Sequence, residues 1–160
     1  MGRYRELIDL LKKYINLFSP FINKSVIEKR LKLTTQQWQT FECILEYEDE
    51  NKNMVYMADR MGIKKSAFTK FVKVLLNYGL VERYQQKSNR KNILLKATEK
   101  GRIYYKDCSQ IILESVWKEP FAALDKLSDE NLAIVIDFFT KIVDELDPKN
   151  NKVEDLFKLL

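Results

Sequence analysis

Cationic and hydroxyl side chains are concentrated at two places in the middle of the sequence, residues 64–73 and residues 87–91. The first group comprises Lys64, Lys65, Ser66, Thr69, Lys70 and Lys73, and the second comprises Lys87, Asn89, Arg90 and Lys91. Lysine and arginine bind phosphate oxygens, and hydroxyl and amide groups both donate and accept hydrogen bonds. These groups could therefore bind a polyanion such as double-stranded DNA, or they could form an ordinary solvated surface.

The charge of the chain is unevenly distributed around these groups. Residues 51–110 contain 14 Lys/Arg and 4 Asp/Glu, a net charge of +10, whereas the rest of the chain contains 14 basic and 19 acidic residues, a net charge of −5. A basic middle between acidic ends indicates a local surface for a polyanion. Charge alone does not distinguish this interpretation from a basic surface without a partner.

Other kinds of chemistry find little support in the sequence. The 160 residues include no histidine and two cysteines, which excludes histidine-based catalysis and leaves too few ligands for a structural zinc ion unless subunits share one. The acidic residues Glu46, Glu48, Asp49 and Glu50 could hold a metal ion, but a solvated helix end and loop is the favoured interpretation. We therefore expect no catalytic residue, no metal, no cofactor and no enzymatic activity.

The two cysteines could instead act as redox sensors. Cys43 has the acidic neighbours Glu42 and Glu46, which disfavour a thiolate, whereas Cys108 lies near Lys106 and is the better candidate. Buried or inactive thiols are commoner, and this is the preferred interpretation of both.

The first basic group falls on the outer face of a predicted helix. Residues 65–78 place four apolar side chains at helical spacing on the opposite face, namely Phe68, Phe71, Val72 and Leu75. A shorter helix precedes it, with Asn53 as its N-cap and Gly62 at its end. Two short helices separated by a tight turn form a helix-turn-helix.

The second basic group falls in a predicted β-hairpin. The apolar period changes from about 3.6 to about 2 after Gly79, which predicts strands at residues 80–84 and 93–97 around a polar turn at residues 86–92. A basic hairpin directly after a helix-turn-helix is typical of a winged helix. The expected fold class is therefore mostly α with a small β-hairpin wing.

Further amphipathic helices are predicted on both sides of this module. Their expected limits are residues 4–18, ended by Ser19-Pro20; residues from Thr34 or Thr35 to about 48; residues 98–119, ended by Pro120; and residues 128–147, with helical spacing again at Val153, Leu156, Phe157 and Leu160. The apolar faces of the first and last of these helices offer more surface than the central module can bury, which predicts a homodimer. The expected dimerisation residues are Leu7, Leu11, Ile15, Phe18, Phe138, Phe139, Ile142 and Leu146.

From residue 33 to residue 101 the sequence resembles the MarR family of bacterial winged-helix regulators. The segments that carry the resemblance are LTTQQW at 33–38, MADRMGIKKSAFTKFVKVL at 57–75, GLVER at 79–83 and NRKNILLKATEKG at 89–101. The resemblance implies that residues 65–78 enter the major groove, that the wing reaches the minor groove, and that the first and C-terminal helices form a dimer. It also implies promoter regulation, often relieved by a small-molecule effector.

The sequence departs from the family pattern at three functional positions, Asn89, Lys91 (a lysine without the planar fork of arginine) and Lys64. Asn89-Arg90-Lys91 stands where the family usually has Asp-x-Arg, so a carboxylate that commonly braces the wing is missing. Lys64 stands where the family often has a serine cap, although lysine caps poorly and faces the positive end of the helix dipole. A local rule broken at a binding surface suggests a nearby anion, and a tolerated flaw is the alternative.

The remaining expectations concern organisation and partners. We expect one domain over residues 1–160, with the winged helix at 34–97 and dimerisation regions at 1–33 and 98–160. Trp38, Tyr104, Trp117 and Phe121 could line an effector pocket, although a core role is favoured. The absence of a signal or membrane segment predicts a cytoplasmic location. The expected function is a transcriptional regulator, in particular a repressor, that binds palindromic double-stranded DNA as a homodimer; the alternative is a winged helix for protein contacts or plasmid replication initiation.

Overall fold

The computed structural model describes residues 2–22, 31, 33–86 and 89–147. These residues divide into two compact units, and the division falls between Leu113 and Glu114. The expected helical tail at 153–160 lies outside the described residues. The described chain is mostly α-helical with one antiparallel hairpin, which confirms the expected fold class.

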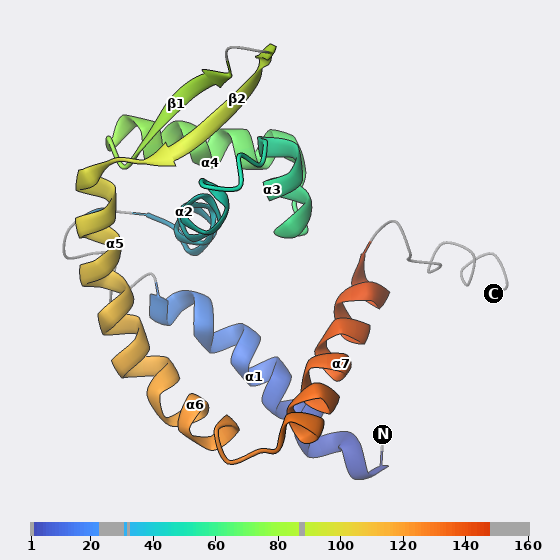
Figure 1. Cartoon of the computed structure of the whole chain (residues 1–160). Helices are drawn as coiled ribbons and strands as arrows, with labels where there is room; N and C mark the ends of the chain where they lie inside the picture. Colours follow the sequence, from blue (N-terminus) through green and yellow to red (C-terminus); the bar gives the residue numbers. More distant parts are fainter. Residues whose placement is uncertain (1, 23–30, 32, 87–88, 148–160) are drawn as a thin grey trace, which may run out of the picture. The chain divides into compact units, whose positions relative to one another are not determined.

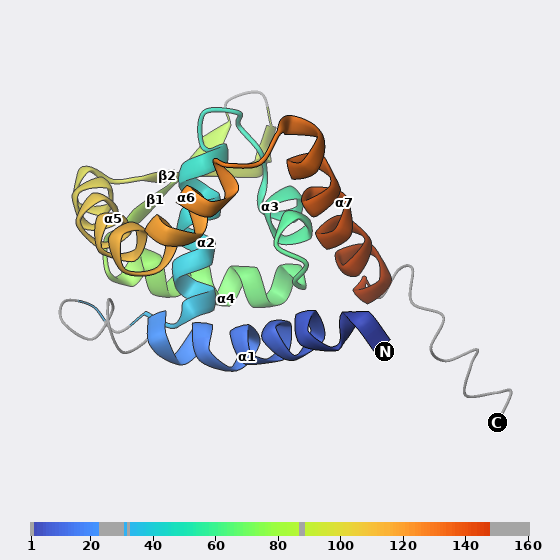
Figure 2. The same cartoon turned by 90° about the horizontal axis from the view of Figure 1, so that it is seen from below.

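The first unit contains the helix-turn-helix and the hairpin (Figure 1). Its elements are the 3₁₀ turn η1 (Gly2–Tyr4), α1 (Arg5–Ile22), α2 (Thr35–Tyr47), α3 (Met54–Arg60), α4 (Lys65–Asn77), β1 (Val81–Gln86), β2 (Asn89–Ala97) and α5 (Glu99–Ile112). Helix α2 lies between α3 and α5 in both views of the ribbon (Figures 1 and 2). The division between the units falls within the π-helical turn η3 (Leu113–Trp117), and the second unit continues with α6 (Lys118–Leu124) and α7 (Asp129–Leu146).

The core of the first unit forms between α2, α4 and the hairpin. Its most deeply buried apolar side chains are Phe41 and Ile44 of α2, Met57 of α3, Phe68, Val72 and Leu75 of α4, Leu80 just before β1, and Leu95 of β2. The predicted inward face of α4 is confirmed for Phe68, Val72 and Leu75, whereas Phe71 is only half-buried. Burying this apolar stripe fixes the opposite face of α4 toward solvent.

Side-chain caps set the starts of several helices, among them α2 and α3. Thr34, rather than Thr35, is the N-cap of α2 and forms a reciprocal capping box with Gln37. Asn53 caps α3, since its Oδ1 accepts hydrogen bonds from the backbone N–H groups of Val55 and Tyr56, each at 3.0 Å.

Two helix ends expected at prolines are wrong. Pro20 lies inside α1, which continues to Ile22, because a proline near a helix end removes only one backbone hydrogen bond there. Pro120 lies in the first turn of α6, where a missing N–H costs little. The single long helix expected over residues 98–119 is instead divided. Its α-helical part, α5, ends at Ile112, and the π-helical turn η3 follows directly.

The hairpin is longer than expected. Strands β1 and β2 pair in register from Val81↔Ala97 to Gln85↔Ile93, and after a register shift Gln86 pairs with Asn89. Residues 89–92, expected in the turn, therefore belong to β2. Backbone pairing does not need apolar side chains, so hydropathy alone placed the strand boundary too late.

Candidate nucleic-acid interface

The turn between α3 and α4 presents α4 to solvent. Gly62 adopts φ +64°, a left-handed conformation that glycine adopts without strain, and the backbone N–H of Ile63 donates to the carbonyl of Ala58. Helix α4 then starts after Lys64, whose side chain makes no capping hydrogen bond. Helix α4 thus begins without a side-chain cap, although the backbone N–H of Ala67 donates to the carbonyl of Lys64 at 2.9 Å.

The predicted groove-facing residues all lie on the outer side of α4 and at its start. Lys64, Lys65, Ser66, Lys70 and Lys73 are exposed, and Thr69 is half-buried. Among the described residues none of the four lysines forms an ion pair, so their charges are not neutralised by the protein. The Thr69 hydroxyl donates to the carbonyl of Lys65 at 2.9 Å, which leaves its oxygen able to accept a hydrogen bond from a ligand.

The second basic group is placed only through its backbone. Asn89, Arg90 and Lys91 are the first three residues of β2, and Lys87 lies outside the described residues. The hairpin leaves the core immediately after α4, through Gly79 at φ +66° and the buried Leu80. The first basic group, on α4, and the described part of the second, on β2, therefore belong to one compact unit (Figure 1).

The acidic run after α2 contains a residue that the sequence interpretation placed wrongly. Glu48 is only 4% exposed. Its Oε1 lies 2.6 Å from Nη1 of Arg102, and its Oε2 accepts a 2.7 Å hydrogen bond from the backbone N–H of Ala97. The hydrogen bond between the Arg102 guanidinium and the Glu48 carboxylate raises the pKa of Arg102. Helical spacing offered a signal, because residue 48 continues the inward stripe of Phe41 and Ile44.

The neighbouring acidic residues are solvated, as expected. Asp49 is exposed and lies 3.9 Å from Nζ of Lys96, and Glu50 lies 3.5 Å from Nζ of Lys52. Over the part of the chain that the structure describes, no three His, Cys, Asp or Glu side chains gather as metal ligands would.

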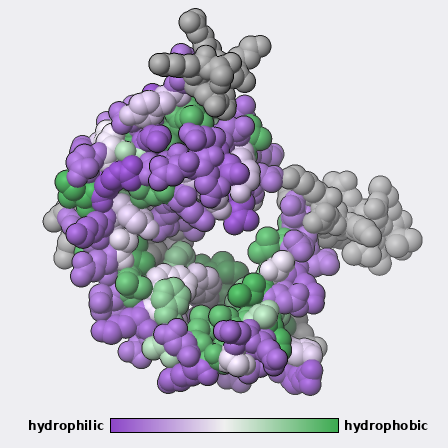
Figure 3. All heavy atoms as spheres, viewed as in Figure 1, coloured by the Kyte–Doolittle hydropathy of each residue, from purple (hydrophilic) through white to green (hydrophobic). Residues whose placement is uncertain are grey.

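The expected dimerisation residues are incompletely buried within their own units. On α1, Leu7 and Ile15 are exposed, Ile15 by 69%, and Leu11 and Phe18 are half-buried. On α7, Phe139 and Leu146 are exposed, Leu146 by 70%, and the other two residues, Phe138 and Ile142, are half-buried. Figure 3 shows such hydrophobic side chains on the surface of the outer helices, whereas the winged-helix part is mainly hydrophilic on the same face.

The expected pocket aromatics are in packed surroundings. Trp38 and Tyr104 are buried, with ring centroids 6.1 Å apart, and Trp38 also stacks on Tyr105 at 5.4 Å. Burial raises the pKa of Glu42 beside them, although the Trp38 indole donates a hydrogen bond to its carboxylate. Their burial is thus accounted for by core packing, and a role in an effector pocket stays a prediction.

The third of these aromatics lies in the other unit. Trp117 is half-buried and stacks on Phe121, with ring centroids 5.4 Å apart and planes 16° from parallel.

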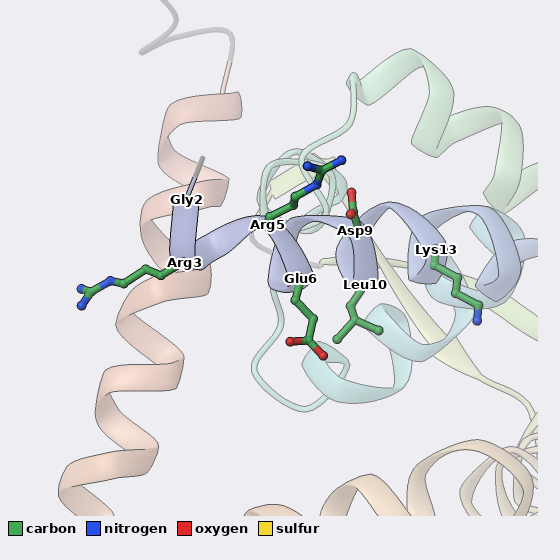
Figure 4. A pocket seen from close by; sticks show the side chains of 7 residues that line it. All are labelled: Gly2, Arg3, Arg5, Glu6, Asp9, Leu10 and Lys13. Carbon is green, nitrogen blue, oxygen red and sulfur yellow. The ribbon is translucent and has the colours of Figure 1, made fainter.

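A hollow of about 560 Å³ runs along the first turns of the chain and is lined by Gly2, Arg3, Arg5, Glu6, Asp9, Leu10 and Lys13. All of these residues are exposed. Figure 4 shows Arg5 and Asp9 on one side of the helix and Glu6 and Leu10 on the other, so the side chains do not converge on a point. The hollow is an open helix surface of mixed charge rather than a binding site.

The thiol of Cys43 lies in surroundings that disfavour the thiolate. Cys43 is buried, and its Sγ lies 3.8 Å from the carbonyl oxygen of Met57. Burial and the nearby Glu46 carboxylate raise the pKa of the Cys43 thiol to about 11, against the opposing charge of Arg60. Cys108 is buried as well. The environment of Cys43 supports the interpretation as a structural thiol.

A helix-turn-helix followed by an antiparallel hairpin, with an unneutralised cationic face on the second helix, defines a winged helix-turn-helix protein. Residues 33–93 match the model described as MarR family. This segment is thus similar in sequence to the MarR family and has the winged helix-turn-helix fold, in agreement with the resemblance read from the sequence. No curated protein matches the chain in sequence. Helices long and apolar enough to cross a membrane are not found in the described part of the chain.

Several solved structures share the fold over most of the chain. FabT of Streptococcus pneumoniae in complex with DNA is 18% identical, with a TM-score of 0.67 over 89% of this chain and 96% of FabT. The S. aureus MepR–DNA complex is 13% identical, with a TM-score of 0.70 over 91% of this chain and 99% of MepR. The transcriptional regulator SlyA is 20% identical, with a TM-score of 0.68 over 92% of this chain and 98% of SlyA.

Proposed function

We propose that this chain is a DNA-binding transcriptional regulator that acts as a homodimer on a palindromic site. The observation that carries the proposal is the outer face of α4, where Lys65, Lys70 and Lys73 are exposed and, among the described residues, unpaired. FabT and MepR, which share the fold, are DNA complexes by their descriptions. A cytoplasmic location and the absence of enzymatic activity belong to the same proposal.

In this proposal α4 lies in the major groove. Lys65 and Ser66, in its first turn, face base edges, and Lys70 and Lys73 reach acceptors or flanking phosphates. The outer face of α4 offers no arginine and only a late asparagine, Asn77, so few side chains can form two bonds to one base. Phosphate contacts then supply much of the affinity, and binding falls steeply with salt.

The uncapped start of α4 also fits an anionic partner. Lys64 occupies the N-cap position without bonding the backbone, so neither its cation nor the positive end of the helix dipole is compensated by its side chain. A DNA phosphate at this end would compensate both. This gives the poor cap a functional reason rather than a tolerated defect.

The wing and the outer helices complete the proposal. Arg90, near the start of β2, is the residue expected to enter a minor groove. Lys87, Asn89 and Lys91 are expected to lie near the phosphate backbone of the DNA. The exposed apolar residues of α1 and α7, such as Ile15 and Leu146, supply the dimer contact. Two α4 helices about one DNA turn, roughly 34 Å, apart would then read a palindrome.

Repression relieved by a small molecule is the expected mode of regulation, with Trp38, Tyr104 and Trp117 as candidate pocket residues. Because the rings of Trp38 and Tyr104 are buried, an effector would have to displace packed side chains rather than fill open space. Such an effector would bind a minor conformation of the protein.

The test is recovery of DNA fragments bound by the full chain across a genome, followed by fluorescence titration of the recovered sequence. An inverted repeat common to the fragments, bound more tightly than unrelated duplex, is the expected result. Directly repeated sites would instead favour a replication initiator, and no enrichment at all would overturn the DNA-binding function.

A further inference from the structure

The start of α5 contacts the ends of α4 and α2 through side chains, and it approaches the backbone that links α4 to the hairpin. The residues involved are Thr98, which caps α5, and Lys100, Gly101 and Arg102 within its first turn. We call these four residues, together with Glu48 of the α2 end, the α5 junction. Each contact joins α5 to an element that carries proposed DNA-binding residues or supports one.

One side of the α5 junction holds the end of α4. Nζ of Lys100 donates a 2.6 Å hydrogen bond to the carbonyl of Tyr78, the C-cap of α4, where a cation is favoured by the helix dipole. The hydroxyl of Thr98 donates a 2.7 Å hydrogen bond to the carbonyl of Gly79. The end of α4 is thus tied to α5 by two side chains rather than left to solvent.

Gly101 allows α5 to approach the chain segment that links α4 to the hairpin. A Cβ at this position would lie 2.1 Å from the carbonyl oxygen of Leu80. That oxygen already accepts the backbone N–H of Thr98 at 3.0 Å. Backbone atoms cannot shift cheaply, so only glycine fits the observed contact.

The other side of the α5 junction holds the base of the hairpin. Glu48 is buried, and its two carboxylate oxygens bond to different elements: Oε1 to Arg102 of α5 and Oε2 to the backbone N–H of Ala97, the last residue of β2. A carboxylate buried to this degree needs both partners, because removal of either leaves a desolvated charge under-compensated. Glu48 therefore joins α2, β2 and α5 at one point.

We propose that the α5 junction fixes the orientation of α4 and the wing relative to α5, and that Lys100 and Arg102 are positioning residues for DNA binding. The proposal rests on the proposed DNA-binding function but adds residues that touch no DNA. Helix α5 continues through η3 into the second unit, which carries part of the proposed dimer contact. A change in the direction of α5 would therefore move α4 and the wing together. The distance between the two α4 helices of a dimer would then depend on α5.

Hydrogen exchange of the full chain, followed by mass spectrometry, tests the coupling without DNA. The variant is Arg102→Gln, compared with Arg102→Lys, which keeps the charge, and with Lys118→Gln, which removes a lysine from an exposed ion pair with Glu114. We expect exchange to become about tenfold faster in residues 81–97 and at the end of α4 for Arg102→Gln. The effect should be smaller for Arg102→Lys and absent for Lys118→Gln.

Two exchange results would overturn the coupling. Faster exchange confined to the first turn of α5 would show that the contacts do not hold its neighbours. Faster exchange by one factor in every segment of the first unit would show a general loss of stability without positioning. Lys100→Met provides a second variant, because it keeps the aliphatic stem and should loosen only the α4 side of the α5 junction.

A DNA measurement tests the consequence for spacing. The probes are duplexes selected by the wild-type chain from a random pool, and derivatives in which the centre is lengthened or shortened by one base pair. Arg102→Gln should reduce the wild-type preference for the selected spacing, so that the ratio of affinities moves toward one. If Arg102→Gln kept the wild-type ratio of affinities for the selected and the altered spacings, the positioning role would be overturned. If the wild-type chain selects no duplex, the proposed function fails, whereas the exchange result still decides the coupling.

Discussion

Glu48 and Arg102 form a 2.6 Å ion pair in which the two partners differ sharply in exposure. The Glu48 side chain is 3% exposed, whereas that of Arg102 is 47% exposed. A largely solvated guanidinium thus neutralises a carboxylate that is almost fully desolvated. The pair lies 54 residues apart in sequence and depends on the fold being complete.

The first prediction concerns the stability that this pair provides. Glu48→Ala should lower the free energy of unfolding by about 2 kcal/mol, because Arg102 and the Ala97 N–H both lose their acceptor. Chemical denaturation measures the change. The matched control is Asp49→Ala, since the side chain of Asp49 is 93% exposed and should contribute less than about 0.5 kcal/mol. Equal effects of the two variants would contradict the assignment of Glu48 as a buried bridge.

The second prediction concerns phosphate contacts from α4. Lys70→Gln should weaken binding to all duplexes alike and reduce the slope of log affinity against log salt by about 1, because one counterion-releasing contact is lost. Fluorescence anisotropy over a salt series measures the slope. Lys141→Gln, which removes an exposed lysine of α7 paired with Asp137, serves as control. A slope shared by wild type and Lys70→Gln would remove Lys70 from the interface.

The third prediction concerns the wing. Arg90→Ala should weaken DNA binding while the melting temperature changes little, because an arginine contact to a minor groove is lost and β2 keeps its backbone pairing. Titration at moderate salt and thermal unfolding measure the two effects. Unchanged affinity would count against Arg90 as a DNA contact, and a large fall in melting temperature would point to a structural role.

The fourth prediction concerns the Cys43 thiol. Its pKa of about 11 in the folded chain exceeds its ordinary value of 9.0. The unfolded chain therefore loses this proton first, so the thiol's contribution to stability is complete below about pH 9 and is lost as the pH rises toward about 11. Stability measured against pH should fall over this window, and the Cys43→Ala variant should lack that component of the fall.

Alkylation gives an independent reading of the same thiol. Modification of Cys43 in the folded chain, followed by peptide mass spectrometry, should be slow near neutral pH and accelerate in alkaline solution. Rapid modification at neutral pH would contradict the raised pKa. Loss of DNA binding after mild peroxide treatment would revive the redox-sensor interpretation for one of the cysteines.

The fifth prediction concerns association. Light scattering at micromolar concentration should show a dimer, and Ile15→Asp should shift it to monomer by placing a charge in the proposed apolar contact. Ile15 is 69% exposed within the chain, so the folded first unit should tolerate the change. Val55→Asp, at a 52% exposed apolar residue of α3, is the control. A monomeric wild-type chain would overturn the dimer.

The winged helix could be predicted from the sequence because its signals are local. Asn53 and Gly62 mark the ends of α3, and the change of apolar period after Gly79 marks the hairpin. Each feature depends on residues within one or two turns. The fold class and the outward face of α4 follow from such signals alone.

Features that depend on distant partners could not be predicted in the same way. Glu48 looks like one of several solvated acids until Arg102 and the Ala97 N–H are brought against it by the fold. The prolines misled for a related reason, since Pro20 and Pro120 were treated as helix terminators without knowing how close each lies to a helix end. The wing side chains stay predictions, because their role depends on a partner that the chain alone does not contain.

The hydroxyl of Thr98 accepts the Gly101 N–H at 3.0 Å while donating to Gly79, so its proton and a lone pair both have fixed partners. One oxygen atom therefore begins one helix and closes the turn after another. Valine has the same shape as threonine but could do neither, whereas serine could do both. Position 98 should accordingly require a hydroxyl group rather than a particular side-chain volume. Related sequences should therefore carry threonine or serine here, and not valine.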